Sequence, residues 1–126
     1  MNIERIDYKK ALSLRCMEKE SIDFKFYPNC QYIGAYEDGR LVGMVAWQMV
    51  GQSLRYKSDC VLPAYRKRGI YSALWKARDE ATKDMKCESI TAYCTPMSIA
   101  MYMSRGFVQG KTNKFGITFV KKENRK

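Results

Sequence analysis

The chain of 126 residues contains no histidine, and its five cysteines do not fall at the paired spacings of metal sites. A zinc site without histidine needs closely spaced cysteine ligands, so we expect no metal. The absence of histidine also leaves no imidazole to activate a thiol nucleophile. An odd number of cysteines without a pairing pattern is typical of reduced, mostly buried thiols in a cytoplasmic protein.

Long apolar runs are missing as well. The first seven residues lack the hydrophobic core of a signal peptide. No segment approaches the roughly 20 apolar residues of a membrane-spanning helix. Linkers, repeats and low-complexity stretches are also absent, and a chain of this length supports one domain with a modest core. We therefore expect a single domain over residues 1–126, located in the cytoplasm, with no membrane partner.

Acidic residues are scarce in the second half of the chain. Residues 1–63 contain nine Lys/Arg and eight Asp/Glu, whereas residues 64–126 contain fourteen and five. The excess is consistent with a phosphorylated ligand, a steering field or a nucleic-acid footprint. Because the cations are scattered and not interleaved with aromatic residues, we favour a solvated surface over a basic nucleic-acid-binding domain.

Hydrophobic periodicity predicts an α/β (α+β) chain. A helix capped by Asp7 is expected to extend to about residue 20, and Asp38-Gly39 is a hairpin turn. A helix over residues 70–84 is expected to bury Ile70, Leu74, Ala77 and Ala81, and a short helix spans residues 97–104. Strands are predicted over residues 2–7, 31–37, 41–50, 53–62, 89–94, 107–109 and 115–121. The segment 53–94 is then a parallel strand–helix–strand crossover in a mixed sheet.

The loop between the strand over 53–62 and the helix that follows has the features of a phosphate site. A turn at Pro63 leads to three consecutive cations, Arg66, Lys67 and Arg68, and then to Gly69. The first N–H groups of a helix have no intrahelical partner and lie at the positive end of its dipole, so they attract anions. Gly69 has no Cβ to obstruct a ligand. The segment matches neither a P-loop nor a dinucleotide fingerprint.

Two segments of this chain resemble motifs of the GCN5-related N-acetyltransferase (GNAT) family. Val61-Leu62-Pro63 and the run from Arg66 to Tyr71 resemble its acyl-CoA loop. The segment 95–107 resembles its late motif, with Ser98, Tyr102, Gly106 and Phe107 at the family spacing. The chain departs from the family at Tyr71, where glycine or alanine is usual, and at Thr95, where asparagine is common. We expect Tyr71 either to crowd the diphosphate or to turn its ring outward.

The resemblance implies a GNAT-like fold with six to seven mostly antiparallel strands, helices on both faces and a splayed central strand pair. It implies acetyl-CoA as co-substrate, with no metal, and direct transfer of the acetyl group to a primary amine in a ternary complex. Tyr102 matches the tyrosine that protonates the leaving thiolate, although a core aromatic is the alternative. The cofactor-binding residues would be Cys60, Val61, Arg66, Lys67, Arg68, Gly69, Ile70, Tyr71, Ser72, Thr95 and Ser98.

The base is less clearly indicated. Arg55 occupies the place where some family members have a glutamate. By strand alternation Asp59 lies on the same face as residues 55 and 57, which makes it our candidate base. The alternatives are a structural aspartate paired with Lys57 or Arg55, an ordered water, or the more remote Glu37.

The acceptor, a small-molecule amine or an amine of a protein or peptide, is not determined by the sequence. Its pocket would draw on five aromatic residues, although sheet packing explains Tyr36 and Trp47 better. A catalytically weak or inactive acyl-CoA-binding module is the main alternative to an enzyme, and a homodimer is left open. The five aromatic residues are Phe24, Phe26, Tyr27, Tyr36 and Trp47.

Overall fold

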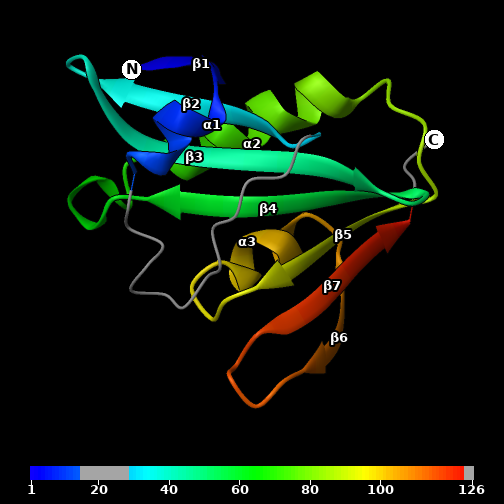
Figure 1. The fold of residues 1–126 in the computed structure, drawn as a ribbon. Helices are drawn as coiled ribbons and strands as arrows, with labels where there is room; N and C mark the ends of the chain where they lie inside the picture. The colour runs from blue at the N-terminus through cyan, green and yellow to red at the C-terminus, as the bar shows by residue number, and fades with distance from the viewer. Residues whose placement is uncertain (15–28, 124–126) are drawn as a thin grey trace.

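The computed structural model describes residues 1–14 and 29–123. Within them, seven strands form one sheet in the order β1-β2-β3-β4-β5-β7-β6 (Figure 1). Every neighbouring pair is antiparallel except β4 and β5, which run parallel. The predicted mixed, mostly antiparallel sheet is therefore confirmed. The strands are β1 (Asn2–Ile6), β2 (Gln31–Glu37), β3 (Arg40–Val50), β4 (Ser53–Val61), β5 (Ser89–Cys94), β6 (Val108–Thr112) and β7 (Thr118–Glu123).

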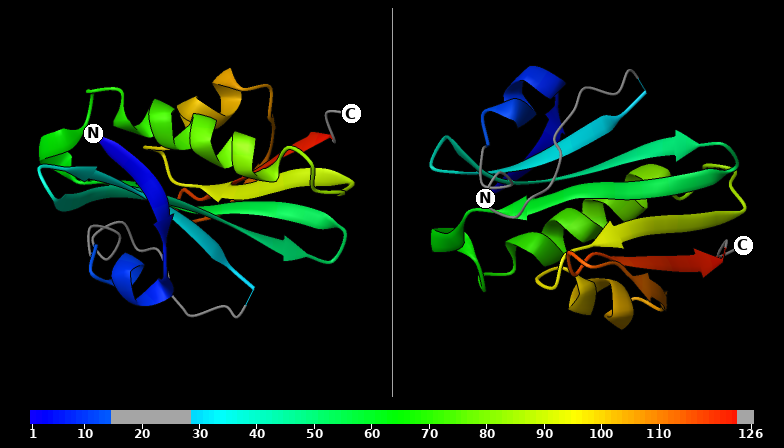
Figure 2. Two further views of the ribbon diagram at one scale, coloured as in Figure 1. Left: turned by 90° about the horizontal axis from the view of Figure 1, so that it is seen from above. Right: turned by 60° about the horizontal axis from the view of Figure 1, so that its bottom comes forward.

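Helices cover both faces of this sheet. Figure 2 shows α2 (Ile70–Thr82) and α3 (Ile99–Ser104) on one face and α1 (Tyr8–Leu12) on the other. Each face has its own buried cluster, with Leu74 and Trp75 of α2 in the larger and Ala11 of α1 in the smaller. None of the helices in the described ranges is long and apolar enough to cross a membrane.

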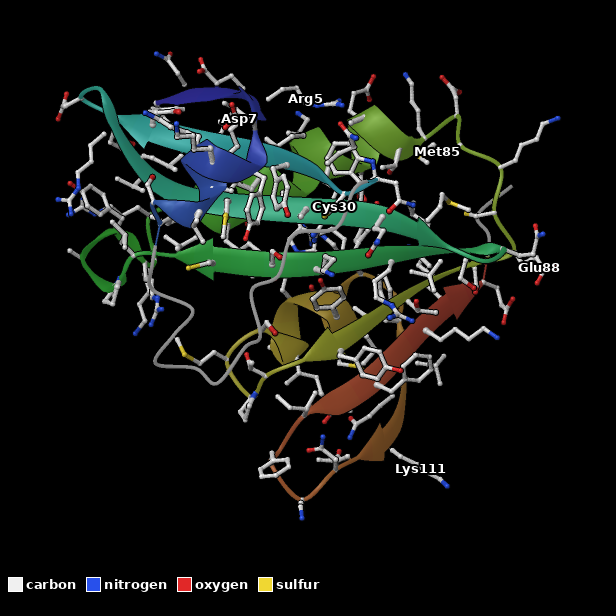
Figure 3. All side chains as sticks on the ribbon, viewed as in Figure 1. Arg5, Asp7, Cys30, Met85, Glu88 and Lys111 are labelled. Atoms are coloured by element: carbon white, nitrogen blue, oxygen red, sulfur yellow. The ribbon has the colours of Figure 1, made fainter. Side chains whose placement is uncertain are left out.

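Local signals in the first half of the chain act as the sequence predicts. Asp7 lies at the start of α1 (Figure 3), and its Oδ1 accepts a hydrogen bond from the Lys10 N–H at 2.7 Å. Asp38 and Gly39 have φ angles of 49° and 78°, the left-handed conformation that tight hairpins require. Only Tyr8–Leu12 of the first predicted helix falls within the described helix, and its continuation beyond residue 14 lies outside the described residues, as do Phe24, Phe26 and Tyr27.

The buried stripe of α2 differs from the predicted one. Ile70 and Leu74 are buried as expected, but Ala77 is half-buried and Ala81 is exposed. The stripe instead follows every fourth residue through Arg78 and Thr82, because the helix crosses the sheet along one ridge of side chains. An arginine at 78 was not expected in the core, and its partner in the site explains why it is tolerated there.

The segments after α2 follow the predicted order with shifted ends. The β6 and β7 strands extend over Val108–Thr112 and Thr118–Glu123 instead of residues 107–109 and 115–121. The Asn113 side chain sets the turn between them, because its Oδ1 accepts hydrogen bonds from the N–H groups of Phe115 and Ile117 at 2.8 and 3.0 Å. This side-chain turn occupies residues that strand periodicity alone assigned to β7.

The two central strands pair over only part of their length. Ser53 to Arg55 of β4 lie beside Ser89 to Thr91 of β5, and beyond this point no pairing continues. Figure 1 shows the two strands diverging toward their C-terminal ends. The predicted splayed central pair is therefore present.

Candidate active site

A hollow of about 370 Å³ opens where the ends of β4 and β5 diverge. One wall comes from the end of β4 and the loop into α2, and the other comes from the segment between β5 and α3. Eleven of the thirteen site residues that the sequence predicts line it. The lining residues are Asp59, Cys60, Val61, Tyr65, Arg66, Lys67, Gly69, Ile70, Tyr71, Ser72, Thr95, Met97, Ser98 and Met101.

The loop after β4 presents the beginning of α2 to the hollow. Gly69 has a φ of 81°, a left-handed conformation that lets the chain turn directly into the helix, and a Cβ there would meet open space. The first helical bond runs from the Ala73 N–H to the Gly69 carbonyl at 3.1 Å. The N–H groups of the first three helical residues, Ile70, Tyr71 and Ser72, therefore have no carbonyl of their own helix to bond. This geometry suits an anion in the hollow.

The three cations of the loop have different positions. Arg66 spans the hollow, because its Nε donates to the Val61 carbonyl at 2.8 Å and its Nη1 to the Met97 sulfur at 3.8 Å. Lys67 is exposed and lines the hollow, with a φ of 64°. Arg68 is exposed outside the lining, and its guanidinium lies 5.2 Å from the centre of the Tyr65 ring. Arg66 and Lys67 therefore supply positive charge at the lining itself.

The opposite wall is held together by short polar contacts. The Thr95 and Ser98 hydroxyls lie 3.3 Å apart, and the Ile99 N–H donates to the Thr95 carbonyl at 3.1 Å. These bonds fix the turn that leads from β5 into α3. Met97 and Met101 add an apolar surface on this side, which the sequence did not single out.

A bulge in β4 determines which way Asp59 points. Lys57 lies opposite Ala46 and Cys60 opposite Met44, so two residues of β4 face one residue of β3. Ser58 has a φ of 60° at this bulge. The extra residue reverses the alternation of side chains, so Asp59 faces α2. The expectation that Asp59 shares a face with residues 55 and 57 is therefore wrong.

Asp59 is paired with Arg78 of α2, not with Lys57 or Arg55. The Asp59 side chain is 6% exposed, the Arg78 side chain is fully buried, and the Nη1–Oδ1 distance is 2.7 Å. A second bond runs from Nη2 to Oδ2 at 3.1 Å, which makes the pair bidentate. Arg78 Nη1 also donates to the Ala46 carbonyl at 3.0 Å. Arg55 bonds the Thr91 hydroxyl on the other face of the strand, at 3.3 Å.

Two tyrosine hydroxyls complete the surroundings of Asp59. The Tyr102 hydroxyl donates to Oδ2 at 2.8 Å, and the Tyr71 hydroxyl donates to the same oxygen. Tyr71 lines the hollow, whereas Tyr102 is 2% exposed and lies outside the lining. The Tyr102 ring packs edge-on against Trp75 and Phe107 at centroid distances of 5.0 and 5.1 Å. The ring of Tyr71 thus turns inward, which neither of the two sequence-based expectations described.

Burial and the Asp59 charge shift the pKa values of this cluster. Burial, and then the Asp59 carboxylate, raise the pKa of Tyr71 and of Tyr102 above the ordinary tyrosine value. Burial alone would lower the pKa of Arg78, but the Asp59 carboxylate outweighs it and raises that pKa overall. In the resting cluster the tyrosines are therefore neutral donors and the arginine is charged.

The cysteines near the hollow are not activated thiols. Burial, followed by the Asp59 charge, raises the pKa of Cys94 to about 12, so Cys94 stays a neutral thiol at physiological pH. Cys60 is disulfide-bonded, which contradicts the expectation of a reduced thiol at that position. Cys30, Cys87 and Cys94 do carry thiols.

The remaining candidates lie away from the hollow. Trp47 is 4% exposed, and the Arg5 guanidinium lies 4.9 Å from the centre of the Trp47 ring, so sheet packing accounts for Trp47. Tyr36 and Glu37 belong to the end of β2 and do not line the hollow. The sequence missed Arg78, which carries no motif signal and reads as one more surface cation of an amphipathic helix.

Comparisons with known proteins identify the fold and the family. The profile of the Acetyltransferase (GNAT) family matches residues 1–107. No curated protein matches the sequence. Ard1 from Thermoplasma volcanium superposes with a TM-score of 0.78 at 15% identity, covering 99% of this chain and 98% of that one. The ribosomal-protein-S18-alanine N-acetyltransferase from Escherichia coli superposes with a TM-score of 0.76 at 12% identity, and the match covers 98% of this chain and 93% of that one.

A third solved structure carries a ligand. PaiA N-acetyltransferase from Thermoplasma acidophilum, solved in complex with coenzyme A, superposes with a TM-score of 0.66 at 16% identity. The match covers 75% of this chain, which spans 61% of the PaiA chain. These likenesses show a shared fold, and the profile match covers most of the sequence. The chain therefore belongs to the acetyltransferase (GNAT) family.

Proposed function

We propose that this protein transfers an acetyl group from acetyl-CoA to a primary amine by direct attack in a ternary complex. The observation that carries the proposal is the hollow between β4 and β5, which meets the beginning of α2 beside two cations. An acyl-CoA thioester held there, with the CoA diphosphate on the helix N-terminus, lies next to Asp59, which is the only carboxylate among the described lining residues. Membership of the family supports acyl transfer in general, and the hollow supports acetyl-CoA as the donor.

The diphosphate is proposed to bind the N–H groups at the start of α2. Arg66 and Lys67 line the same part of the hollow and supply the charge that several phosphate oxygens need. Gly69 leaves open space where any other residue would carry a Cβ. The pantetheine arm then follows Val61 on one side and the turn from Thr95 to Ser98 on the other.

The chemistry is proposed to centre on Asp59. Among the described residues that line the hollow its carboxylate is the only base, and it accepts the proton that the attacking amine releases. The family spacing assigns proton donation to Tyr102, and the geometry offers Tyr71 as a second candidate for that role. A covalent acyl-cysteine is disfavoured, because Cys60 is disulfide-bonded and the pKa of Cys94 is raised to about 12 by burial and then by the Asp59 charge.

One observation favours the alternative of an acyl-CoA-binding module without turnover. Both Asp59 oxygens are already occupied, by Arg78 and by the two tyrosines. A carboxylate held in this way is less available to an amine than a solvated one. Among the described residues no comparable feature supports the basic nucleic-acid alternative, and Lys111 of β6 points outward (Figure 3).

Binding is tested by calorimetric titration with acetyl-CoA and CoA. We expect binding at micromolar to sub-millimolar concentrations and a loss of at least about tenfold in affinity for Gly69→Val, because the β-branched side chain obstructs the phosphates and strains the left-handed backbone. Gly51→Val is the matched control, since Gly51 also has a positive φ with open space around it but lies in the β3–β4 turn. Wild-type protein that binds neither ligand at millimolar concentration would refute the proposal.

Turnover is tested by the release of free CoA thiol with a panel of amines. The panel contains spermidine, a lysine-containing peptide and a peptide that begins with alanine, the last because a similar structure is named as an alanine N-acetyltransferase. Acetylation of any of them, confirmed by mass, supports the enzyme. Tight binding of CoA with no acetylation of any amine would favour the binding module.

A further inference from the structure

Two residues that line the hollow bond each other, because the Tyr71 hydroxyl donates to the Asp59 carboxylate. Tyr71 is the second residue of α2, and its side chain reaches from the helix to Oδ2 of Asp59 on β4. Both residues belong to the lining of the hollow. A ligand that fills the hollow therefore lies against both residues of this bonded pair.

Tyr102 bonds the same Asp59 oxygen from α3. It donates to Asp59 Oδ2 at 2.8 Å, but its ring is enclosed by Trp75 and Phe107 and it does not line the hollow. Of the two tyrosines that bond Asp59, Tyr102 is therefore the one outside the lining. Tyr71 itself lines the hollow.

We propose that Tyr71 is the catalytic residue that protonates the departing thiolate, in relay with Asp59. This inference rests on the proposed acetyl transfer and assigns one of its steps. Tyr71 stands where the family usually has glycine or alanine, so the assignment is particular to this chain.

The relay conserves protons and electrons. The amine nitrogen forms a bond to the thioester carbonyl carbon, and Asp59 takes one N–H proton. The C–S bond then breaks, its electron pair leaves with sulfur, and the Tyr71 O–H proton moves to the thiolate. The protonated Asp59 returns its proton to the Tyr71 oxygen, so the products are an amide and CoA thiol and the protein is unchanged.

Protonation of Asp59 is the step that allows Tyr71 to transfer its proton. In the resting state burial, and then the Asp59 charge, raise the pKa of Tyr71, so the hydroxyl keeps its proton. When the carboxylate becomes neutral, its charge no longer raises the pKa of Tyr71, and the hydroxyl releases its proton more readily. Arg78, on the far side of Asp59, stays charged throughout and keeps the carboxyl in place.

The experiment compares two thioester analogues in three variants. Tyr71→Phe, Tyr102→Phe and the control Tyr93→Phe each remove one hydroxyl, and Tyr93 lies on β5 outside the lining and is 58% exposed. Each protein is assayed with acetyl-CoA and with acetyl-seleno-CoA, using the amine of the panel that wild type acetylates fastest. A selenolate leaves without a proton, so loss of an acid matters much less for it.

We expect Tyr71→Phe to lower kcat with acetyl-CoA by about 100-fold or more, because general acid catalysis contributes about 10²–10⁴-fold. The deficit with acetyl-seleno-CoA is expected to be at least about tenfold smaller, while the Kd for CoA changes less than about threefold. Tyr102→Phe is expected to show the same deficit with both donors, and Tyr93→Phe none.

Two results would overturn the inference. One is an equal deficit of Tyr71→Phe with both donors, and the other is unchanged kcat in Tyr71→Phe beside a selenium-sensitive deficit in Tyr102→Phe. Thermal melts of all variants separate misfolding from loss of the hydroxyl. If wild type binds CoA but acetylates no amine of the panel, the proposed turnover fails, and the relay fails with it.

Discussion

The ion pair between Asp59 and Arg78 predicts a large loss of stability when one partner is removed. Replacing Arg78 by methionine keeps much of the side-chain volume but deletes the guanidinium. The Asp59 carboxylate, 6% exposed, would then be held only by two tyrosine hydroxyls. A buried charge without its counter-ion is costly because neither solvent nor partner compensates it.

The magnitude follows from the geometry. Breaking a buried ion pair by removing one partner costs about 3–5 kcal/mol of the free energy of unfolding. We expect the lower end, about 3 kcal/mol, since the two hydroxyls remain as donors. For a domain of this size that loss lowers the melting temperature by roughly 10–15 °C. Adding Asp59→Asn to the variant is expected to cost less than the sum of the single changes, because the unpaired carboxylate is then removed.

The assay is urea unfolding followed by tryptophan fluorescence, since Trp75 packs against Arg78 at 4.6 Å. Lys76→Met is the matched control, because Lys76 lies exposed on the same helix, and a surface change is expected to stay within about 0.5 kcal/mol. A loss of less than about 1 kcal/mol for Arg78→Met would mean that solvent reaches Asp59 and that the cluster is not a buried one.

Two further predictions concern proton binding. Burial raises the pKa of Tyr56 to about 12, and burial followed by the Asp59 charge raises the pKa of Tyr71 and of Tyr102. Unfolded tyrosines release their protons near pH 10, so these three tyrosines are expected to leave the free energy of unfolding unchanged below about pH 10 and to lower it above that pH, by about 1.4 kcal/mol per pH unit for each tyrosine. Urea unfolding between pH 9 and 11.5 measures this slope, and a flat profile would contradict it. Burial, followed by the Asp59 charge, raises the pKa of Cys94 to about 12. Iodoacetamide at pH 8.5 is therefore expected to leave Cys94 unmodified in the folded protein and to alkylate it in urea, as measured by peptide mass. Equal alkylation rates in the two states would be contrary to this reasoning.

The local features of this chain were readable from the sequence because each depends on neighbouring residues. Asp38-Gly39 adopts the left-handed turn that its residue types favour, and Asp7 caps α1. The order of strand, cations, Gly69 and helix places the beginning of α2 at the hollow. The two family motifs come together at one hollow because they follow β4 and β5, the strands that part from each other.

The roles within the site depended on tertiary structure. Strand alternation placed Asp59 beside residues 55 and 57, but the bulge at Ser58 reverses the face, and no pattern marks a serine with positive φ. A helical arginine reads as a surface cation unless its partner is known, and the partner of Arg78 is 19 residues away on another element.

The direction of Tyr71 was decided in the same way. Its position in the loop was readable, but its contact with Asp59 joins residues 12 apart on a helix and a strand. The sequence by itself determined where a helix N-terminus would follow a glycine turn, because free N–H groups and a glycine turn are properties of a short segment. Only the packed structure decided which hydroxyls face the carboxylate, because that depends on how α2 and α3 lie against β4.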